Sequence, residues 1–257
     1  NPGASLNYPV PHSYVNTSCP GNRLEAVLTI RNNCGNTRGS VANITILKKP
    51  IANFAAPAVS CANTNINFQN TTIGGYNQDC TQELIFTWDF GDGSPIVTTP
   101  LQLPQGISHT YAAPGIYYVT LTAIGFCGQD AITKPICIED PIAPQVTFSD
   151  VEGCTPLNVS TTNTTNLTGL CSTPTYAWTV AYAQGNCASG TPVWNFTNGT
   201  TASSSNPSFN FVTPGTYTVS LRMTNSCGPS QNLVRTIIVK QPPQAIINPI
   251  LDSCGPV

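Results

Sequence analysis

The stretch YYVTLTAIGFCG, Tyr117 to Gly128, has the clearest strand pattern of this chain. Alternate residues of an extended strand point to opposite faces, so one face of this stretch is apolar and the other is rich in threonine. A strand with one apolar face is typical of a sheet that packs against a second layer. The apolar face consists of Tyr117, Val119, Leu121 and Ala123.

Two further segments repeat this pattern: LEAVLTIRNNCG, which ends at Gly35, and YTVSLRMTNSCG, which ends at Gly228. In each copy a second cysteine follows the first by 27 residues, and the copies are separated by 93 and then 100 residues. Identical spacings of this kind indicate a duplicated module. Trp88 and Trp178 lie on apolar runs at corresponding places in two copies, so we expect both to be buried between two sheets.

The composition excludes several classes of protein. Only 8% of the 257 residues are charged, against about 25% in an average soluble protein, and the formal net charge is −2. We therefore expect no nucleic-acid partner, and no apolar run approaches the roughly 20 residues that a membrane helix needs. The 23 prolines and 20 glycines separate short runs that favour strands, and no amphipathic helix is apparent.

Eleven cysteines, two histidines and no CxxC pair favour disulfides in an oxidising, extracellular compartment over a zinc site. The first residues lack the basic and apolar regions of a signal peptide, so we expect a mature segment or a piece of a longer chain. Eight N-x-S/T sequences occur, which matter only where asparagine is glycosylated: Asn16, Asn43, Asn70, Asn158, Asn163, Asn166, Asn195 and Asn198.

The motifs WDFGDGS, from Trp88, and SHTYAAPGIYYVTLTA, from Ser108, resemble the signature of PKD (polycystic kidney disease) domains, which are Ig-like β-sandwiches. The resemblance implies an all-β chain of tandem sandwiches arranged end to end. It implies a PKD domain at 50–141 and a diverged one at 142–242, where YAWTVAYAQGN replaces the first motif. Residues 1–49 resemble the C-terminal part of a preceding copy, and residues 243–257 the first strand of a following one.

The Ig-like strand order that this resemblance implies places cysteines at the two ends of each sandwich. It implies four disulfides: Cys80–Cys127, Cys61–Cys137, Cys171–Cys227 and Cys154–Cys187. Three cysteines are then unpaired within the segment: Cys19, Cys34 and Cys254. A rival pairing of Cys19 with Cys34 stays open at this point.

The stretch FTWDFGDGSP, Phe86 to Pro95, is the one candidate for a metal-binding or catalytic loop. Asp89 and Asp92 are the residues that would hold calcium, but they are three residues apart and no later glutamate completes an EF-hand-like set. Asp-Gly is typical of a turn that closes a strand, and the next copy loses both acids while its strands persist. We therefore interpret the stretch as a turn and expect no cofactor, with calcium at Asp89 and Asp92 as the weaker alternative.

No catalytic residues are predicted. His12 and His109 each precede a tyrosine in an HxY sequence without a matched nucleophile, which indicates a structural hydrogen bond and not a catalytic triad. Two acids three residues apart also cannot easily face each other across a sugar.

These observations predict a non-enzymatic spacer. Tandem, cysteine-containing, Asn/Thr-rich PKD arrays resemble large cell-surface adhesins of Bacteroidetes that serve gliding motility and are exported by the type IX system, which implies attachment to the outer membrane. The expected partners are neighbouring repeats, surface polysaccharide or other surface proteins. The first alternative is the accessory region of a secreted polysaccharide- or protein-degrading enzyme, and the second is a eukaryotic receptor ectodomain, which the compositional bias disfavours.

Overall fold

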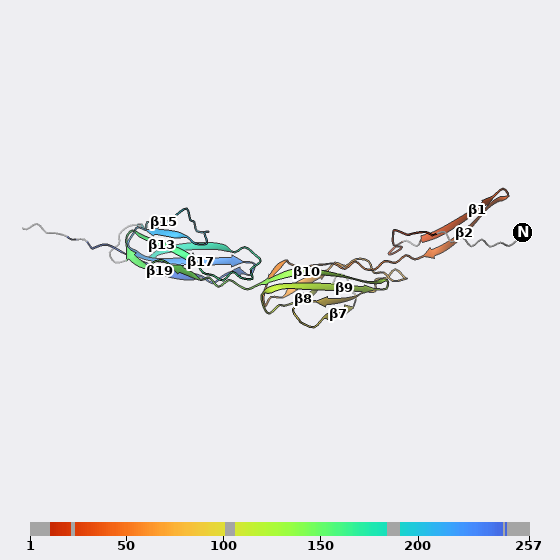
Figure 1. Ribbon diagram of the computed structural model, residues 1–257, viewed down its shortest axis with the longest axis horizontal. Coiled ribbons are helices and arrows are strands. Elements are labelled where there is room, and N and C mark those ends of the chain that lie inside the picture. The colour runs from red at the N-terminus through yellow and green to blue at the C-terminus, as the bar shows by residue number, and fades with distance from the viewer. Residues whose placement is uncertain (1–10, 22–23, 101–105, 184–190, 244, 246–257) are drawn as a thin grey trace, which may run out of the picture. The chain divides into compact units, whose positions relative to one another are not determined.

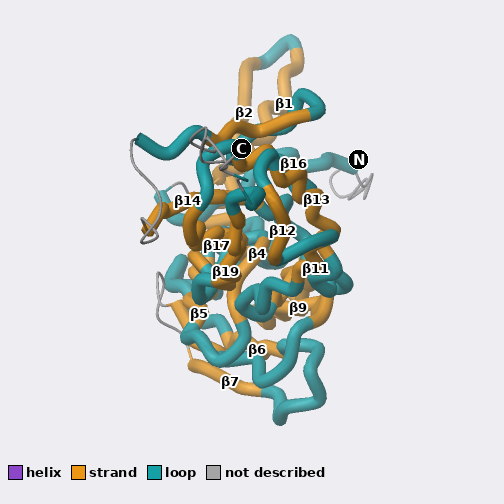
Figure 2. The backbone as a smooth tube through the Cα atoms, turned by 90° about the vertical axis from the view of Figure 1, so that its left-hand side faces the viewer, coloured by secondary structure: helices purple, strands orange, loops and turns teal. Residues whose placement is uncertain are grey.

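The computed structural model describes residues 11–21, 24–100, 106–183, 191–243 and 245. Every regular element in these ranges is a β-strand, and Figure 2 shows strands and loops without a helix. The chain divides into two compact units, Asn1–Ile138 (unit 1) and Glu139–Val257 (unit 2). The finer division at residues 49, 141 and 242 stays a prediction.

The strands of unit 1 are β1 (Leu24–Asn32), β2 (Gly35–Ile44), β3 (Phe54–Ala55), β4 (Val59–Cys61), β5 (Ile66–Asn70), β6 (Ile85–Asp89), β7 (Val97–Pro100), β8 (Gly106–His109), β9 (Gly115–Gly125) and β10 (Gly128–Glu139), the last of which ends on the first residue of unit 2. The strands of unit 2 are β11 (Val146–Phe148), β12 (Glu152–Cys154), β13 (Leu157–Asn163), β14 (Thr175–Ala183), β15 (Trp194–Thr197), β16 (Ser208–Phe211), β17 (Gly215–Asn225), β18 (Gly228–Pro229) and β19 (Leu233–Lys240).

Two sheets of unit 1 enclose its core. One has the order β4-β10-β9-β6-β7 and the other β3-β5-β8. Trp88 on β6 lies opposite Leu121 on β9, and both are buried among aromatic side chains of the facing sheet, including Phe54 and Phe68. The predicted apolar face is confirmed, because Val119, Leu121 and Ala123 are all fully buried.

Unit 2 repeats this plan. Its sheets have the orders β12-β19-β17-β14 and β11-β13-β16-β15, with β18 paired to β17. Trp178 on β14 lies opposite Leu221 on β17, in the same arrangement as in unit 1. In Figure 1, β9 runs beside β10 within unit 1, and β17 beside β19 within unit 2. The two tryptophans are buried as predicted, with 1% and 3% of their surface exposed.

Strands β1 and β2 form a two-stranded hairpin on which Val27, Leu28 and Ile30 are exposed. Leu28 is 62% exposed, whereas Leu121 and Leu221, the residues at the same place in the later copies, are fully buried. The hairpin therefore resembles the last two strands of a sandwich in sequence and pairing. Among the described residues, no second sheet covers its apolar face. The all-β class and the Ig-like sandwich architecture are confirmed.

Candidate functional site

The Asp-Gly stretch of unit 1 is a turn built by carboxylates that accept hydrogen bonds from the backbone. Asp89 ends β6, and its Oδ1 accepts the amide of Gly91 at 2.9 Å. Asp92 Oδ1 accepts both the amide and the hydroxyl of Ser94, at 3.0 and 2.6 Å. Gly91 has φ +74°, and a Cβ there would lie 2.6 Å from the carbonyl oxygen of Tyr118, so only glycine fits. This geometry supports the interpretation as a turn.

His109 fixes the other side of this turn. Its Nε2 lies 2.7 Å from Asp92 Oδ2, and its ring stacks on Phe90 with centroids 3.9 Å apart. Partial burial raises the pKa of Asp92, but hydrogen bonds from Ser94 and His109 outweigh it, so the pKa falls to about 2. Tyr111 lies edge-on to His109 and donates its hydroxyl to the Phe90 carbonyl at 3.1 Å. The HxY sequence is thus part of the support of the turn.

Calcium would find few free oxygens here, because both carboxylate oxygens of Asp92 already accept hydrogen bonds. Among the residues that the structure describes, no group of three His, Cys, Asp or Glu side chains is arranged to hold a metal ion. The absence of a cofactor stays a prediction, and calcium binding by Asp89 and Asp92 stays the untested alternative to the turn.

Two predictions are wrong because Cys80 bonds to Cys19: the Cys80–Cys127 disulfide does not form, and Cys19 is not unpaired. Residues 18 and 19 contact the loop that carries Cys80, because Cys80 Sγ lies 3.9 Å from the Ser18 carbonyl oxygen and Cys19 Sγ lies 3.9 Å from the Asn77 carbonyl oxygen. These contacts place Cys19 beside Cys80, although the two cysteines are 61 residues apart in sequence. Cys127 is a free, exposed thiol.

The remaining cysteines divide into three groups. Cys154 is a free, exposed thiol, so its predicted bond to Cys187 is also wrong; Cys187 and Cys254 lie outside the described residues. Cys34 is free and exposed, and the rival Cys19–Cys34 bond does not form. Four more cysteines are disulfide-bonded, and their predicted pairing stays a prediction: Cys61 with Cys137, and Cys171 with Cys227.

Glu139 carries the densest polar network of unit 2, and sequence reasoning missed it. The side chain is fully buried, and its Oε1 accepts the backbone amides of Cys171, at 2.6 Å, and Ser172. Its Oε2 accepts hydrogen bonds from the hydroxyls of Ser172, at 2.7 Å, and Ser226. It also accepts one from the side-chain amide of Asn225, at 3.2 Å. A buried carboxylate is stable only with such partners.

Burial raises the pKa of Glu139, but the hydrogen bonds, first those from Ser226 and Ser172, outweigh this effect and lower the pKa to about 2. The network holds the first residue of unit 2 to two loops that lie more than 30 residues away in sequence. The sequence shows a glutamate directly before Asp140-Pro141. Its hydrogen-bonding partners lie more than 30 residues away, so the buried network could not be inferred from local sequence.

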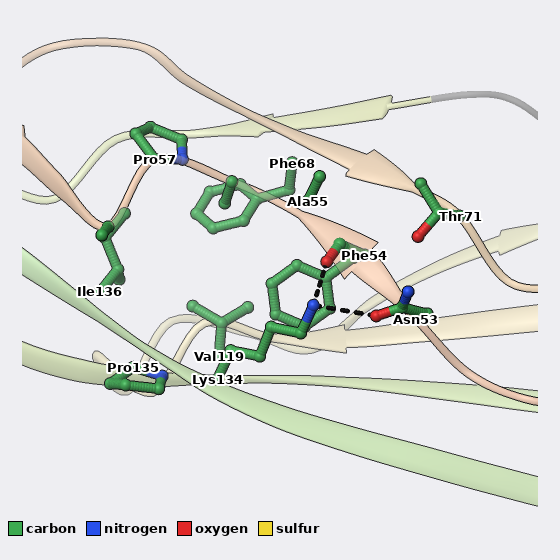
Figure 3. Close-up of a pocket in the computed structure, with 12 residues that line it drawn as sticks. Asn53, Phe54, Ala55, Pro57, Phe68, Thr71, Val119, Lys134, Pro135 and Ile136 are labelled. Carbon is green, nitrogen blue, oxygen red and sulfur yellow. Dashed lines mark hydrogen bonds between the residues drawn. The ribbon is translucent and has the colours of Figure 1, made fainter.

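A groove of 630 Å³ opens between β3 and β10 of unit 1 (Figure 3). Its lining is mostly apolar, and Lys134 is its one charged residue. The Lys134 ammonium donates to Asn53 Oδ1 at 2.9 Å and to the Phe54 carbonyl, and it lies 4.9 Å from the Phe54 ring centroid. The lining contains no acid, histidine or cysteine, so the groove has no pair of groups for acid–base or nucleophilic catalysis.

Within the described residues, the structure holds no helix of the length and apolarity that crossing a bilayer requires. The disulfides indicate an oxidising, extracellular location.

The chain matches one protein family twice, with limits close to those of the two units. The family model described as "PKD domain" matches residues 47–139 and again residues 140–240. Human Polycystin-1 is 50% identical over 38 residues, which cover 15% of this chain and 1% of that protein.

Among solved structures, the PKD1 domain of Vibrio anguillarum Epp matches at 23% identity with a TM-score of 0.28, over 37% of this chain and all of that one. The I-band fragment I67-I69 from titin matches at 11% identity with a TM-score of 0.46, over 77% of this chain and 68% of that one. PKD and Ig-like domains are typically non-catalytic modules. Because its two family matches together span most of its length, the chain belongs to the PKD domain family.

Proposed function

We propose that this chain is a non-enzymatic repeat segment of a large cell-surface adhesin or filament, in which it acts as a spacer for attachment or gliding motility. The observation that carries the proposal is the succession of two PKD domains with adjoining limits, 47–139 and 140–240. Two modules that follow each other without an intervening linker add length to a protein and leave little slack between them.

The surface chemistry supports the same role. The chain has few charges. Among the described residues, the groove of unit 1 carries no catalytic set and six cysteines are disulfide-bonded. Disulfides limit how far a pulled chain can extend and stabilise small sandwiches by about 2–4 kcal/mol each. In this proposal the neighbouring repeats are the first partners, and the parent protein is exported by the type IX system to the outer membrane of a Bacteroidetes cell.

Mechanical stretching of the purified chain between its ends tests the spacer role. We expect two separate unfolding events under non-reducing conditions, and a longer released length for each event after reduction. Extension without any resisted event would contradict the proposal.

Location is tested separately, by antibodies against residues 106–183 applied to intact cells of the source organism. Labelling without permeabilisation supports a surface protein. A secreted, soluble parent protein with a hydrolase domain in its reading frame would instead favour the accessory role.

A further inference from the structure

The outer face of one sheet of unit 2 is a regular array of uncharged polar side chains. Strands β11, β13, β15 and β16 contain no Asp, Glu, Lys or Arg. Strand pairing brings their outward residues into two rows that cross three strands. The hydroxyl row is Ser160, Ser208 and Thr197, and the asparagine row is Asn158, Asn210 and Asn195.

The hydroxyl row lines a hollow of 370 Å³ on this face. Within the described part of the chain, the hydroxyls of Ser160, Ser208 and Thr197 make no hydrogen bond to another residue. Each is therefore available as both donor and acceptor. In the adjacent row, Asn210 donates to Asn158 Oδ1 at 2.8 Å, which orients both amides across the strands.

Aromatic packing on the inner side makes the array rigid. Phe209 is fully buried beneath the rows and contacts the rings of Phe196 and Trp178, with centroids 5.2 and 5.9 Å apart. The strand spacing then sets the distance between successive hydroxyls at about 4.8 Å. Hydrogen-bonding groups held in place before binding lose little entropy when a ligand arrives.

Unit 1 lacks this array. Its corresponding sheet has only the strands β3-β5-β8, and the outward residues on β8 are Gly106 and Ser108. The fourth strand of unit 2, β15, supplies Thr197 and Asn195, the third member of each row. The array is therefore a property of unit 2 alone.

We infer that the two rows form a binding site for a neutral glycan chain. A polyhydroxyl ligand offers donors and acceptors along its length and carries no charge, which matches a face of amides and hydroxyls without ionisable groups. An anionic polysaccharide would find no cation among the four strands. This inference does not depend on the spacer role, because binding and mechanical resistance are measured separately.

Affinity electrophoresis tests the site. The whole chain, produced in a host without asparagine-linked glycosylation, is run in native gels that contain dextran, mannan or xylan, with alginate gels and plain gels alongside. We expect at least one neutral polysaccharide to retard the chain. The triple variant Ser160→Ala, Thr197→Val, Ser208→Ala removes three hydroxyls and should weaken retardation at least tenfold.

A matched control removes three hydroxyls from the outer face of the opposite sheet of unit 2: Thr179→Val, Thr218→Val and Ser220→Ala. The control should be retarded like the unmodified chain, and circular dichroism should show both variants folded. Three outcomes would overturn the inference: retardation by none of the neutral polysaccharides, retardation by alginate alone, or equal loss in both triple variants. Self-association through this face, seen by light scattering as dimers that the first triple variant abolishes, would also overturn it.

Discussion

The strand that follows the buried tryptophan joins different sheets in the two units. In unit 1, β7 pairs with β6, so Trp88 lies opposite Val97 on the same sheet. In unit 2, β15 leaves that sheet and pairs with β16, so Phe196 lies opposite Phe209 on the facing sheet. The two cores are otherwise built alike. The tryptophan and the long hairpin beside it are therefore constrained by packing, whereas the connection between them is free to vary and to create a new surface.

The cysteines differ between the units in the same region. Cys80 of unit 1 bonds to Cys19 and leaves Cys127 free, whereas their counterparts in unit 2, Cys171 and Cys227, are both disulfide-bonded. Unit 1 uses a cysteine at this end to bind an upstream segment, and unit 2 uses the buried carboxylate of Glu139 at the corresponding place.

Removing the tryptophans tests whether the cores are equivalent. Trp88→Ala and Trp178→Ala should each cost about 3–5 kcal/mol, because each leaves a large cavity among aromatic side chains. We expect each substitution to destabilise its own unit only. Hydrogen exchange followed peptide by peptide should then show reduced amide protection in that unit and unchanged protection in the other. Loss of protection in both units from one substitution would show that they do not unfold separately.

Removing Cys19 tests the disulfide of unit 1. Cys19→Ser should destabilise unit 1 by roughly 2–4 kcal/mol, because the bridge closes a long loop. Cys127→Ser, which changes an exposed free thiol, should stay within about 0.5 kcal/mol. Denaturant unfolding of both variants provides the measurement. The opposite order of effects would restore the predicted Cys80–Cys127 bond.

Glu139→Gln tests the polar network of unit 2. It should cost about 1–3 kcal/mol at neutral pH, because an amide cannot accept all the donors that the carboxylate accepts. Unit 1 should be unaffected, which separate unfolding transitions would show. Gln145→Ala, an exposed change in the same unit, serves as a control.

The network also predicts how stability depends on pH. The pKa of Glu139 falls from 4.5 to about 2 on folding, so the unfolded chain binds its proton first as the pH decreases. The contribution of the carboxylate is therefore complete above the unfolded pKa and is lost as the pH falls from 4.5 towards about 2. Unfolding titrations of unit 2 should show this slope in the unmodified chain and a shallower one in Glu139→Gln.

The smallest expected effect concerns the Asp-Gly turn, which unit 2 lacks. Asp92→Asn should cost unit 1 about 1 kcal/mol, since the amide keeps one acceptor for Ser94 but loses the charge beside His109. Urea unfolding measures it. If added calcium stabilises unit 1 of the unmodified chain and does not stabilise the Asp92→Asn variant, the turn binds the ion.

Several features could be predicted because they depend on local pattern. Alternation from Tyr117 to Ala123 identified the buried face, and Asp-Gly chemistry identified the turn at Asp92. The partner of Cys80 could not be predicted in this way, because it depends on residues 18 and 19 contacting a loop of the next module. The sheet that β15 joins was equally hidden, since alternation shows which side chains are buried but not which strand is the neighbour.

The exposed thiols of Cys34, Cys127 and Cys154 have a consequence for handling the purified protein. Each of these three thiols of the described residues can link to another molecule, so air oxidation builds branched oligomers and not discrete dimers. Alkylating these groups without a reductant would keep the preparation monodisperse and leave the internal cystines closed.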